Sequence, residues 1–378
     1  MNTETQEKFE QRAQAALEFS GKQLRRLITQ HPDYFPLYTV NGKWKHDMEA
    51  WTNWCEGFLG GMLWIVYRHT GDAWWRERAE HYSLLIEHRK TDQDVHDLGF
   101  LFLPTWKAWY DVTGEPAQNQ VVVDAGKTLA LRFQPKGRYL RSFVSQDSIF
   151  IDIMMNVGII FYAAQQTKDA SLLQVASEHC LTTRRFLVRG DASTSHEGLF
   201  DIETGEFLRQ TTHQGWRNDS SWARGQTWAI YGFTTAYQFT QDARFLDTAQ
   251  RCADFYIKRT PTHGVPPNDW EEPNPTEKYE SSAAAVAAAG LLELAKATDQ
   301  AKADRYREYA FTILDTLLGP EFLANETPGW EGILKHGIYH ERKKLGINES
   351  VMWGEYYFLS ALDKALESIA GANSSSKN

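Results

Sequence analysis

The segment Tyr67-Arg-His-Thr-Gly-Asp72 predicts a tight turn between two helices, and four similar segments recur along the chain. In each of them a glycine or a polar residue ends one helix, and an acidic or polar residue complements the dipole of the next. Because the pattern returns at unequal intervals, we expect a repeated helical hairpin with insertions of variable length. The other segments are Tyr110-Asp-Val-Thr-Gly-Glu115, Ala164-Gln-Gln-Thr-Lys-Asp169, Tyr237-Gln-Phe-Thr-Gln-Asp242 and Ala295-Lys-Ala-Thr-Asp-Gln300.

The helices before and after these turns differ in composition. Those before the turns are apolar on almost every face and rich in small residues, as in Gly57-Phe-Leu-Gly-Gly-Met-Leu-Trp64. Such helices are buried on all sides. Those after the turns are amphipathic, as in Trp75-Arg-Glu-Arg-Ala-Glu-His-Tyr-Ser-Leu-Leu85, and have one face in water. The alternation therefore predicts an inner and an outer layer of helices.

A periodicity of 3.6 residues predicts about twelve helices. Six inner and six outer helices make an all-α fold, the (α/α)6 barrel, a six-hairpin toroid. We expect one catalytic domain of this type over residues 1–370 and a disordered tail over residues 371–378. The expected helices cover residues 5–31, 55–70, 72–90, 97–113, 117–133, 151–167, 169–187, 222–240, 242–259, 280–298, 300–318 and 350–369.

The composition excludes several classes of protein. The 378 residues include 40 basic and 49 acidic side chains, and this net charge of -9 offers no general attraction for nucleic acid. No apolar stretch is long enough to cross a membrane, and Met1–Gln14 contains no apolar targeting segment. Three cysteines without CxxC spacing indicate neither a disulfide framework nor a zinc site, and they favour a cytoplasmic location. The absence of GxGxxG, P-loop, HExxH and GxSxG motifs excludes nucleotide-binding α/β folds, zincins and serine hydrolases.

The inner helices of such a barrel run in the same direction, so their N-terminal ends meet at one mouth. Long connections beside short turns are typical of a functional face. We expect them at this end, over residues 31–55, 133–151, 187–222, 259–280 and 318–350. The residues at these helix starts combine carboxylates, an arginine and tryptophans, which predicts a carbohydrate pocket. They are Trp54, Glu56, His96, Asp97, Asp152, Arg224, Trp228, Tyr279, Glu280, Trp353 and Glu355.

Asp97 and Asp152 are the candidate acid–base residues. Asp152 is the one charge in the apolar run Phe150-Ile-Asp-Ile-Met-Met155. If both carboxyls face one cavity, their mutual repulsion raises one pKa and leaves a protonated acid beside an ionised partner. Such a pair is suited to acid–base work on a glycoside. The alternative for each aspartate is an N-cap, which is the commonest role of Asp at a helix start.

The segments His213-Gln-Gly215 and Trp222-Ala-Arg-Gly-Gln-Thr-Trp228 place hydrogen-bond donors and aromatic faces beside one inner helix. Arg224 has a guanidinium that can bind a carboxylate through two N–H groups, assisted by the positive end of the helix. The alternative is a structural arginine paired with an acidic loop residue. Trp54 and Trp228 fit either a sugar-binding surface or the hydrophobic core.

Six motifs distributed along the chain belong together. They are Trp54-Cys-Glu-Gly-Phe58, His96-Asp-Leu-Gly-Phe100, Arg184-Arg-Phe-Leu-Val-Arg-Gly-Asp191, Thr212-His-Gln-Gly215, Ser221-Trp-Ala-Arg-Gly-Gln-Thr-Trp-Ala-Ile-Tyr-Gly232 and Trp353-Gly-Glu-Tyr-Tyr357. As a set they resemble the unsaturated glucuronyl hydrolases of glycoside hydrolase family 88 over essentially the whole chain. The resemblance implies an α/α six-barrel and a cytoplasmic enzyme that needs no metal or organic cofactor. Its substrates would be lyase products, oligosaccharides with a 4,5-unsaturated uronic acid at the non-reducing end.

The resemblance also implies roles for individual residues. Asp152 would be the general acid and base, and Asp97 would bind the sugar ring and keep Asp152 protonated. Asp152 would protonate C4 of the vinyl ether and then help water add at C5, after which the hemiketal rearranges and releases the neighbouring sugar. The family often has Asp and a further Trp where this chain has Glu56 and Leu59, a departure in the outer part of the site. The residues implied to bind the unsaturated sugar are Trp54, His96, His196, Gln214, Arg224 and Trp228.

Arg342, Lys343 and Lys344 form a basic segment before the last inner helix. Lys343 and Lys344 are candidate contacts for a sulfate on the leaving sugar, and the alternative is a solvated basic loop. Three other functions remain open: a related unsaturated rhamnogalacturonyl hydrolase, an inverting glycosidase acting on a saturated glycoside, and a helical-repeat binding protein. The oligomeric state is left open.

Overall fold

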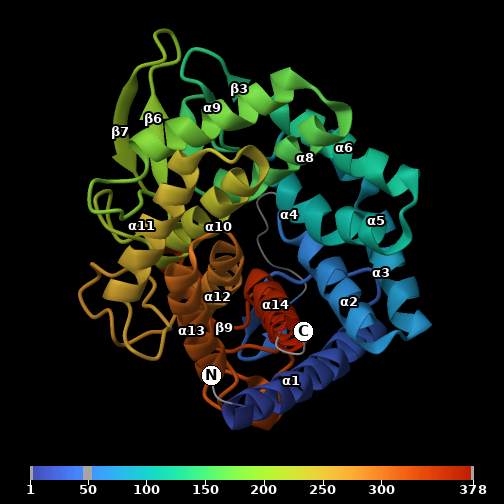
Figure 1. The fold of residues 1–378 in the computed structure, drawn as a ribbon. Helices are drawn as coiled ribbons and strands as arrows, with labels where there is room; N and C mark the ends of the chain where they lie inside the picture. Colours follow the sequence, from blue (N-terminus) through green and yellow to red (C-terminus); the bar gives the residue numbers. More distant parts are fainter. Residues whose placement is uncertain (1–2, 46–52, 376–378) are drawn as a thin grey trace.

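A ring of six inner helices, each packed on the next, forms the centre of the protein (Figure 1). The computed structural model describes residues 3–45 and 53–375. The last inner helix packs against the first and closes the ring, which confirms the predicted (α/α)6 barrel. The inner positions are α2 (Glu56–Thr70), α4 (Leu98–Phe102) continued by η2 (Leu103–Lys107) and α5 (Ala108–Thr113), α7 (Ile153–Asn156) continued by α8 (Gly158–Thr167), α10 (Ala223–Thr240), α12 (Ser281–Lys296) and α14 (Met352–Ser375).

Six outer helices surround this ring, and each packs on the inner helix beside it. They are α1 (Thr3–Gln30), α3 (Ala73–Leu85), α6 (Pro116–Ala130), α9 (Ala170–Phe186), α11 (Ala243–Arg259) and α13 (Gln300–Leu317). The small residues of the inner helices allow neighbouring helices to pack closely around them, as expected. In α12, for example, every residue from Ser281 to Leu292 is buried, because neighbouring helices approach it from all sides.

The predicted turns join the helices at the end opposite the mouth. Gly71 and Gly114 end their inner helices with φ angles of 65° and 69°, a left-handed conformation that glycine adopts without strain. The side chains of Asp72, Asp169 and Asp242 then accept backbone N–H groups in the first turn of the following outer helices. These aspartates are therefore true N-caps.

Two inner helices are less regular than the sequence suggests. The helix expected over 97–113 is divided by a π-helical turn at Leu103–Lys107, where Pro104 has no N–H to donate. The helix expected over 151–167 is interrupted at Val157, between α7 and α8. Each interruption lies shortly after one of the two candidate aspartates, Asp97 and Asp152.

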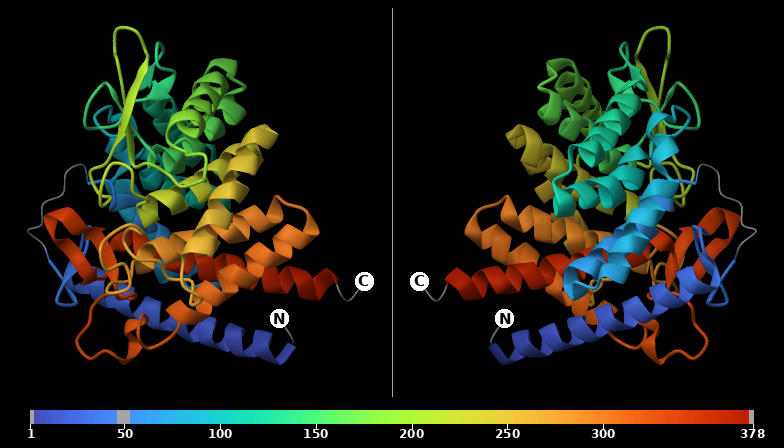
Figure 2. Two further views of the ribbon diagram at one scale, coloured as in Figure 1. Left: turned by 90° about the vertical axis from the view of Figure 1, so that its left-hand side faces the viewer. Right: turned by 90° about the vertical axis from the view of Figure 1, so that its right-hand side faces the viewer.

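Short antiparallel strands occupy the connections at the mouth, where the sequence analysis expected only loops. The largest sheet joins β5 (Ser148–Phe150), β6 (Glu197–Phe200) and β7 (Phe207–Thr211). Figure 2 shows that these strands gather at one end of the ring, away from the two termini. The other strands are β1 (Thr39–Val40), β2 (Lys43–Trp44), β3 (Phe133–Gln134), β4 (Tyr139–Leu140), β8 (Gly337–His340) and β9 (Leu345–Glu349), and the short 3-10 turns are η1 (Glu87–Thr91), η3 (Ala324–Glu326) and η4 (Glu341–Lys343).

The C-terminal helix α14 continues to Ser375 and thus covers the first part of the segment 371–378 that was expected to be disordered. In residues 3–45 and 53–375, no helix combines the length and the apolar character needed to cross a bilayer.

Candidate active site

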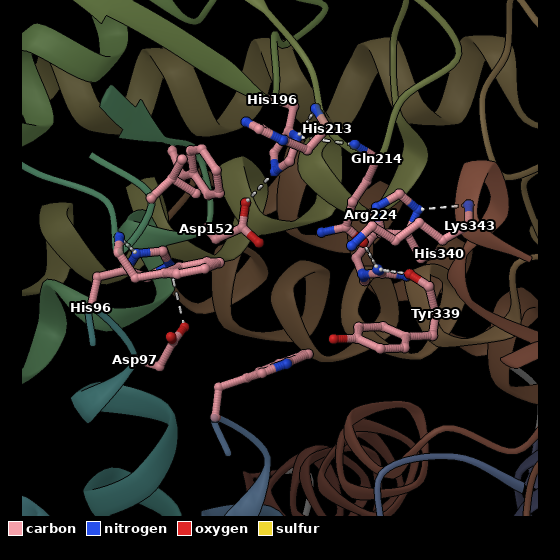
Figure 3. A pocket seen from close by; sticks show the side chains of 14 residues that line it. His96, Asp97, Asp152, His196, His213, Gln214, Arg224, Tyr339, His340 and Lys343 are labelled. Atoms are coloured by element: carbon pink, nitrogen blue, oxygen red, sulfur yellow. Dashed lines mark hydrogen bonds and ion pairs between the residues drawn. The ribbon is translucent and has the colours of Figure 1, made fainter. Parts of the chain in front are cut away.

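A cavity of about 210 Å³ opens at the mouth of the barrel, and its walls come from inner helix starts and from the long connections (Figure 3). Its lining is aromatic and polar, with four histidines and two carboxylates. The lining residues are Trp54, His96, Asp97, Phe143, Val144, Phe150, Asp152, His196, His213, Gln214, Arg224, Tyr339, His340 and Lys343. An aromatic pocket with a few convergent polar groups is typical of a small-molecule site.

Eight of the ten residues expected at the site lie in this lining. Trp228 and Lys344 do not. The eight are Trp54, His96, Asp97, Asp152, His196, Gln214, Arg224 and Lys343. They come from segments that are far apart in the sequence, which only the closed ring of inner helices brings together.

Asp97 and Asp152 occupy the N-cap positions of α4 and α7, yet neither side chain caps its helix. The aspartates before the outer helices, such as Asp72 and Asp169, do make that bond. The carboxyls of Asp97 and Asp152 instead face the cavity. The alternative interpretation of these two residues as helix caps is therefore wrong.

The two carboxyls differ in pKa. Burial and the nearby Asp152 carboxylate raise the pKa of Asp97 to about 8. Burial raises the pKa of Asp152 only to about 6, because Arg224 opposes the effect. The side chain of Asp97 is also less exposed, at 6% against 16% for Asp152. The proton that was expected on Asp152 therefore resides on Asp97 near neutral pH.

Each aspartate faces a buried histidine. Nε2 of His96 lies 3.4 Å from Oδ1 of Asp97, and Nε2 of His196 lies 3.5 Å from Oδ2 of Asp152. Burial holds the pKa of both imidazoles well below the usual range, so they are neutral near pH 7. The Nδ1 atoms accept backbone N–H groups at 3.0 Å, from Phe143 for His96 and from His213 for His196. Each neutral ring must therefore have its proton on Nε2, directed towards its aspartate.

Hydrogen bonds and an ion pair fix the position of the Arg224 guanidinium. Its guanidinium donates to the backbone carbonyls of Ile338 and Tyr339 at 2.6 and 2.8 Å, and it lies 3.4 Å from the Glu280 carboxylate. It also donates to Oε1 of Gln214 at 2.6 Å. The structure thus supports the structural alternative for Arg224, in which it pairs with an acidic residue and orients Gln214 at the cavity wall.

Two tryptophan rings enclose the Arg224 guanidinium and keep its charge away from water. Its Cζ lies 4.5 Å from the ring centroid of Trp222 and 4.9 Å from that of Trp353. Such stacking stabilises a buried guanidinium, so Arg224 is a fixed positive charge beneath the cavity.

Trp228 belongs to the hydrophobic core and not to the cavity wall. It lies one turn deeper along α10 than Arg224, is 1% exposed, and packs against Phe100 and Tyr357. The expectation that Trp228 contacts the sugar is therefore wrong. Lys344 lies on an exposed turn after η4, outside the cavity lining, and only Lys343 of the two lysines reaches the site.

Three carboxylates that the sequence placed at the mouth have structural partners instead. Glu56 forms an ion pair with Arg89 at 2.6 Å. Glu280 accepts N–H groups of Ser282 and Ala283 at the start of α12. The buried Glu355 accepts the N–H groups of the 333–334 segment, where burial raises its pKa to about 8.

Six lining residues were not among the expected site residues: Phe143, Val144, Phe150, His213, Tyr339 and His340. Three of the six lie close in sequence to residues that were expected at the site. His213 directly precedes Gln214, and Phe150 lies two residues before Asp152. His340 precedes the basic segment, and burial lowers its pKa to about 4.

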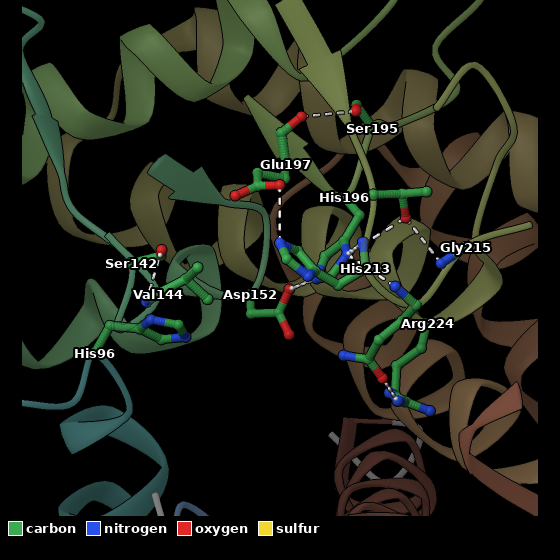
Figure 4. A network of polar contacts seen from close by, with 12 residues as sticks. His96, Ser142, Val144, Asp152, Ser195, His196, Glu197, His213, Gly215 and Arg224 are labelled. Atoms are coloured by element: carbon green, nitrogen blue, oxygen red, sulfur yellow. Dashed lines mark hydrogen bonds and ion pairs between the residues drawn. The ribbon is translucent and has the colours of Figure 1, made fainter. Parts of the chain in front are cut away.

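A chain of polar contacts runs from the exposed His213 through buried residues to the backbone of Val144 (Figure 4). Nε2 of His213 lies 3.0 Å from Oε2 of the buried Glu197, whose Oε1 accepts the hydroxyl of Ser148 at 2.5 Å. Ser142 donates to Ser148 and accepts the N–H of Val144. Ser148 of β5 and Glu197 of β6 thus link His213 with Val144.

This arrangement provides a proton on one carboxyl, an ionised carboxyl near it, and two neutral imidazoles as donors. General acid–base chemistry on a small polar ring is therefore available in this cavity. Among the described residues, no group of three or more His, Cys, Asp or Glu side chains is placed to hold a metal ion.

Comparison with known proteins agrees with this chemistry. The family model described as Glycosyl Hydrolase Family 88 matches residues 30–263. The chain is 34% identical to the unsaturated glucuronyl hydrolase of Bacillus sp. (strain GL1), over 92% of this chain and 94% of that protein. It is 31% identical to the unsaturated chondroitin disaccharide hydrolase of Streptococcus pneumoniae (strain ATCC BAA-255 / R6), over 82% of this chain and 81% of that protein.

Solved structures show the same similarity. The crystal structure of an unsaturated glucuronyl hydrolase from Bacillus sp. GL1 superposes with a TM-score of 0.86 at 33% identity and covers 93% of this chain and 96% of that chain. A variant of the Streptococcus agalactiae unsaturated glucuronyl hydrolase in complex with dGlcA-GalNAc6S superposes with a TM-score of 0.78 at 29% identity, over 93% and 90% of the two chains.

Proposed function

Since the chain belongs to glycoside hydrolase family 88, we propose that it hydrolyses oligosaccharides whose non-reducing end is a 4,5-unsaturated uronic acid. The observation that supports this most directly is the pair Asp97 and Asp152, two carboxyls of raised pKa that face one cavity without capping their helices. As a glycoside hydrolase the protein is an enzyme, which sets aside the helical-repeat binding alternative.

The proposed reaction begins at the C4=C5 double bond, which is conjugated with the ring oxygen as a vinyl ether. Asp152 delivers a proton to C4, and positive charge develops at C5 and the ring oxygen. The Asp152 carboxylate then takes a proton from the water that adds at C5. The resulting hemiketal rearranges and releases the neighbouring sugar, without direct attack at the anomeric carbon.

The buried groups around the pair assist this sequence. Asp97 retains a proton near neutral pH and can donate it in a hydrogen bond to the sugar ring. His196 directs Nε2–H towards Asp152 and stabilises the carboxylate that forms after proton transfer. Trp54, Phe143 and Phe150 offer aromatic surfaces for the ring and the leaving sugar.

Lys343 extends the proposal to the leaving sugar. It lies at the cavity wall beside His340, where an ammonium group suits a sulfate on the sugar beyond the cleaved bond. The S. agalactiae relative in complex with dGlcA-GalNAc6S supports substrates of this class. We propose a preference for sulfated glycosaminoglycan disaccharides.

We also propose a cytoplasmic location, which is supported by the cysteines. Cys55, Cys180 and Cys252 are all free thiols and all buried. Proteins of reducing compartments typically keep their cysteines in this state.

The decisive experiment follows the ultraviolet absorbance of the unsaturated uronate. Incubation with an unsaturated glycosaminoglycan disaccharide should abolish this absorbance as the double bond is hydrated. A matched disaccharide with a saturated uronic acid should be left intact, whereas an inverting glycosidase would cleave it. A parallel assay on an unsaturated rhamnogalacturonan disaccharide distinguishes the related pectin-directed activity. Unchanged absorbance with the glycosaminoglycan disaccharide would refute the proposal.

A further inference from the structure

The side-chain amide of Asn156 joins the two helices that begin at the candidate catalytic aspartates. Asn156 is completely buried at the end of α7, one turn after Asp152. Its Oδ1 accepts the backbone N–H of Phe100 in α4 at 2.8 Å. Its Nδ2 donates to the backbone carbonyl of Asp152 at 3.2 Å. One amide group therefore connects the first turn of α4 with the residue that bears the Asp152 carboxyl.

The N–H that Asn156 satisfies is the one that an N-cap side chain ordinarily accepts. Phe100 is the third residue of α4, and the side chain of an N-cap residue normally accepts the N–H of the second or third residue. Asp97 occupies the N-cap position, but its carboxyl makes no such bond. Asn156 therefore caps α4 from the neighbouring helix.

The helices α4 and α7 are in close contact at Gly99. A Cβ atom at Gly99 would lie 2.5 Å from Cα of Asn156 and 2.9 Å from its Oδ1. Only glycine permits the backbone of α4 to approach α7 this closely. This contact holds the starts of α4 and α7, which bear Asp97 and Asp152, close to each other.

We propose that Asn156 is a positioning residue for the Asp97–Asp152 pair, because its cap on α4 leaves the Asp97 carboxyl free to face the cavity. This inference rests on the proposed function. It assigns a role to a residue that touches neither the cavity nor the substrate.

The charged groups around Asp97 indicate how its pKa should change when the Asn156 cap is removed. In the present position burial and Asp152 raise its pKa, while Arg132 and Arg89 oppose the effect and Asp92 adds to it. The neutral His96 lies on the other side at 3.4 Å. If the Asp97 carboxylate turned to accept the Phe100 N–H, the hydrogen bond and the positive end of α4 would both lower its pKa.

The test begins with Asn156→Ala, which removes the cap. Asp97 should then rotate onto α4 and leave the cavity, so that kcat falls roughly 10- to 100-fold with a smaller change in KM. The limb of the pH–rate profile that belongs to Asp97 should move to lower pH. Asn119→Ala is the matched control, since Asn119 of α6 also bridges two helices, through Gln166 of α8, but neither residue lines the cavity.

Asn156→Asp distinguishes positioning from folding. A protonated carboxyl has the same acceptor and donor as the amide, whereas the ionised form still accepts the Phe100 N–H but loses the donor to the Asp152 carbonyl and adds negative charge beside the pair. Activity relative to wild type at the same pH should therefore recover at acidic pH and fall as the new carboxyl ionises. Recovery of this kind would not follow from a general loss of stability.

Two results would overturn the inference. One is an Asn156→Ala enzyme with the wild-type kcat and pH profile. The other is an Asn156→Asp enzyme that is folded but equally impaired at every pH. Wild-type enzyme without activity on the unsaturated disaccharide would instead refute the proposed function, so the two failures can be told apart.

Discussion

Nε2 of His196 lies 3.5 Å from Oδ2 of Asp152, and neither atom has a hydrogen-bond partner among the described residues. The opposite side of the imidazole is occupied, because Nδ1 accepts the N–H groups of His213 and Gln214. Two buried polar atoms that face each other without forming a hydrogen bond are costly in a resting protein. They are explained if substrate or water completes the contact.

Asp152→Asn should abolish turnover and leave the fold and substrate binding intact. The amide keeps the shape of the carboxyl but cannot deliver a proton, and loss of a general acid typically costs about 10²- to 10⁴-fold in rate. Asp169→Asn is the matched control, because Asp169 caps an outer helix and asparagine caps equally well. Steady-state kinetics of both variants provide the measurement, and residual activity above a few per cent in Asp152→Asn would contradict the assignment.

The pH dependence of kcat/KM should reveal which carboxyl donates the proton. Asp152 must be protonated to act as an acid, and its pKa is raised to about 6, so activity should fall about tenfold per pH unit above that value. The alkaline limb should disappear in Asp152→Asn together with the activity. A profile with no fall near pH 6 and its first alkaline limb near pH 8 would indicate that the proton comes from Asp97.

Gln214→Ala should raise KM about tenfold with little change in thermal stability, as expected for the loss of one hydrogen bond at a binding surface. Arg224→Ala should raise KM as well, because Arg224 orients Gln214. It should also lower the free energy of unfolding by about 3–5 kcal/mol, since it leaves Glu280 buried without its cation. Thermal unfolding and steady-state kinetics of both variants separate the effect on substrate binding from the effect on stability. Equal losses of stability in Gln214→Ala and Arg224→Ala would contradict the prediction.

Lys343→Ala should reduce the preference for sulfated over unsulfated unsaturated disaccharides, and more so at low ionic strength. Lys344→Ala is the matched control, since Lys344 lies outside the cavity. The ratio of kcat/KM values for the two substrates is the readout. If both variants keep the wild-type ratio, the basic segment is a solvated loop.

Gly99→Ala should destabilise the protein and impair catalysis together. The new methyl group would collide with the backbone of Asn156, so α4 must move away from α7. Such a clash typically costs about 1–3 kcal/mol of stability. Chemical denaturation and kinetics provide the test, and Gly71→Ala is unsuitable as a control because Gly71 has a positive φ angle. Gly190→Ala, with open space around the new methyl, serves instead.

The fold was determined by local patterns in the sequence. The turns at Gly71 and Gly114 end helices through the backbone freedom of glycine, and Asp72 begins the next helix by capping it. The all-round apolarity of the inner segments then required burial, and six such helices close a ring. These signals depend on residues close together in the chain, which is why element order and approximate bounds could be predicted.

The site was predicted less completely. Asp97 and Asp152 could be identified because each is a carboxylate at the predicted start of an inner, apolar helix. The exclusion of Trp228 from the cavity could not be predicted, because one further turn of α10 moves a side chain from the wall into the core. Pairing of β5 with β6 joins segments about fifty residues apart, which local patterns do not specify.

The location of the proton was decided by the tertiary structure alone. The sequence predicted that the two aspartates face one cavity, but their pKa values depend on burial and on charges brought from elsewhere in the fold. Arg224 holds the pKa of Asp152 below that of Asp97 across the cavity. In the same way, the helix cap that Asp97 does not make is supplied by Asn156, because folding brings α7 against α4.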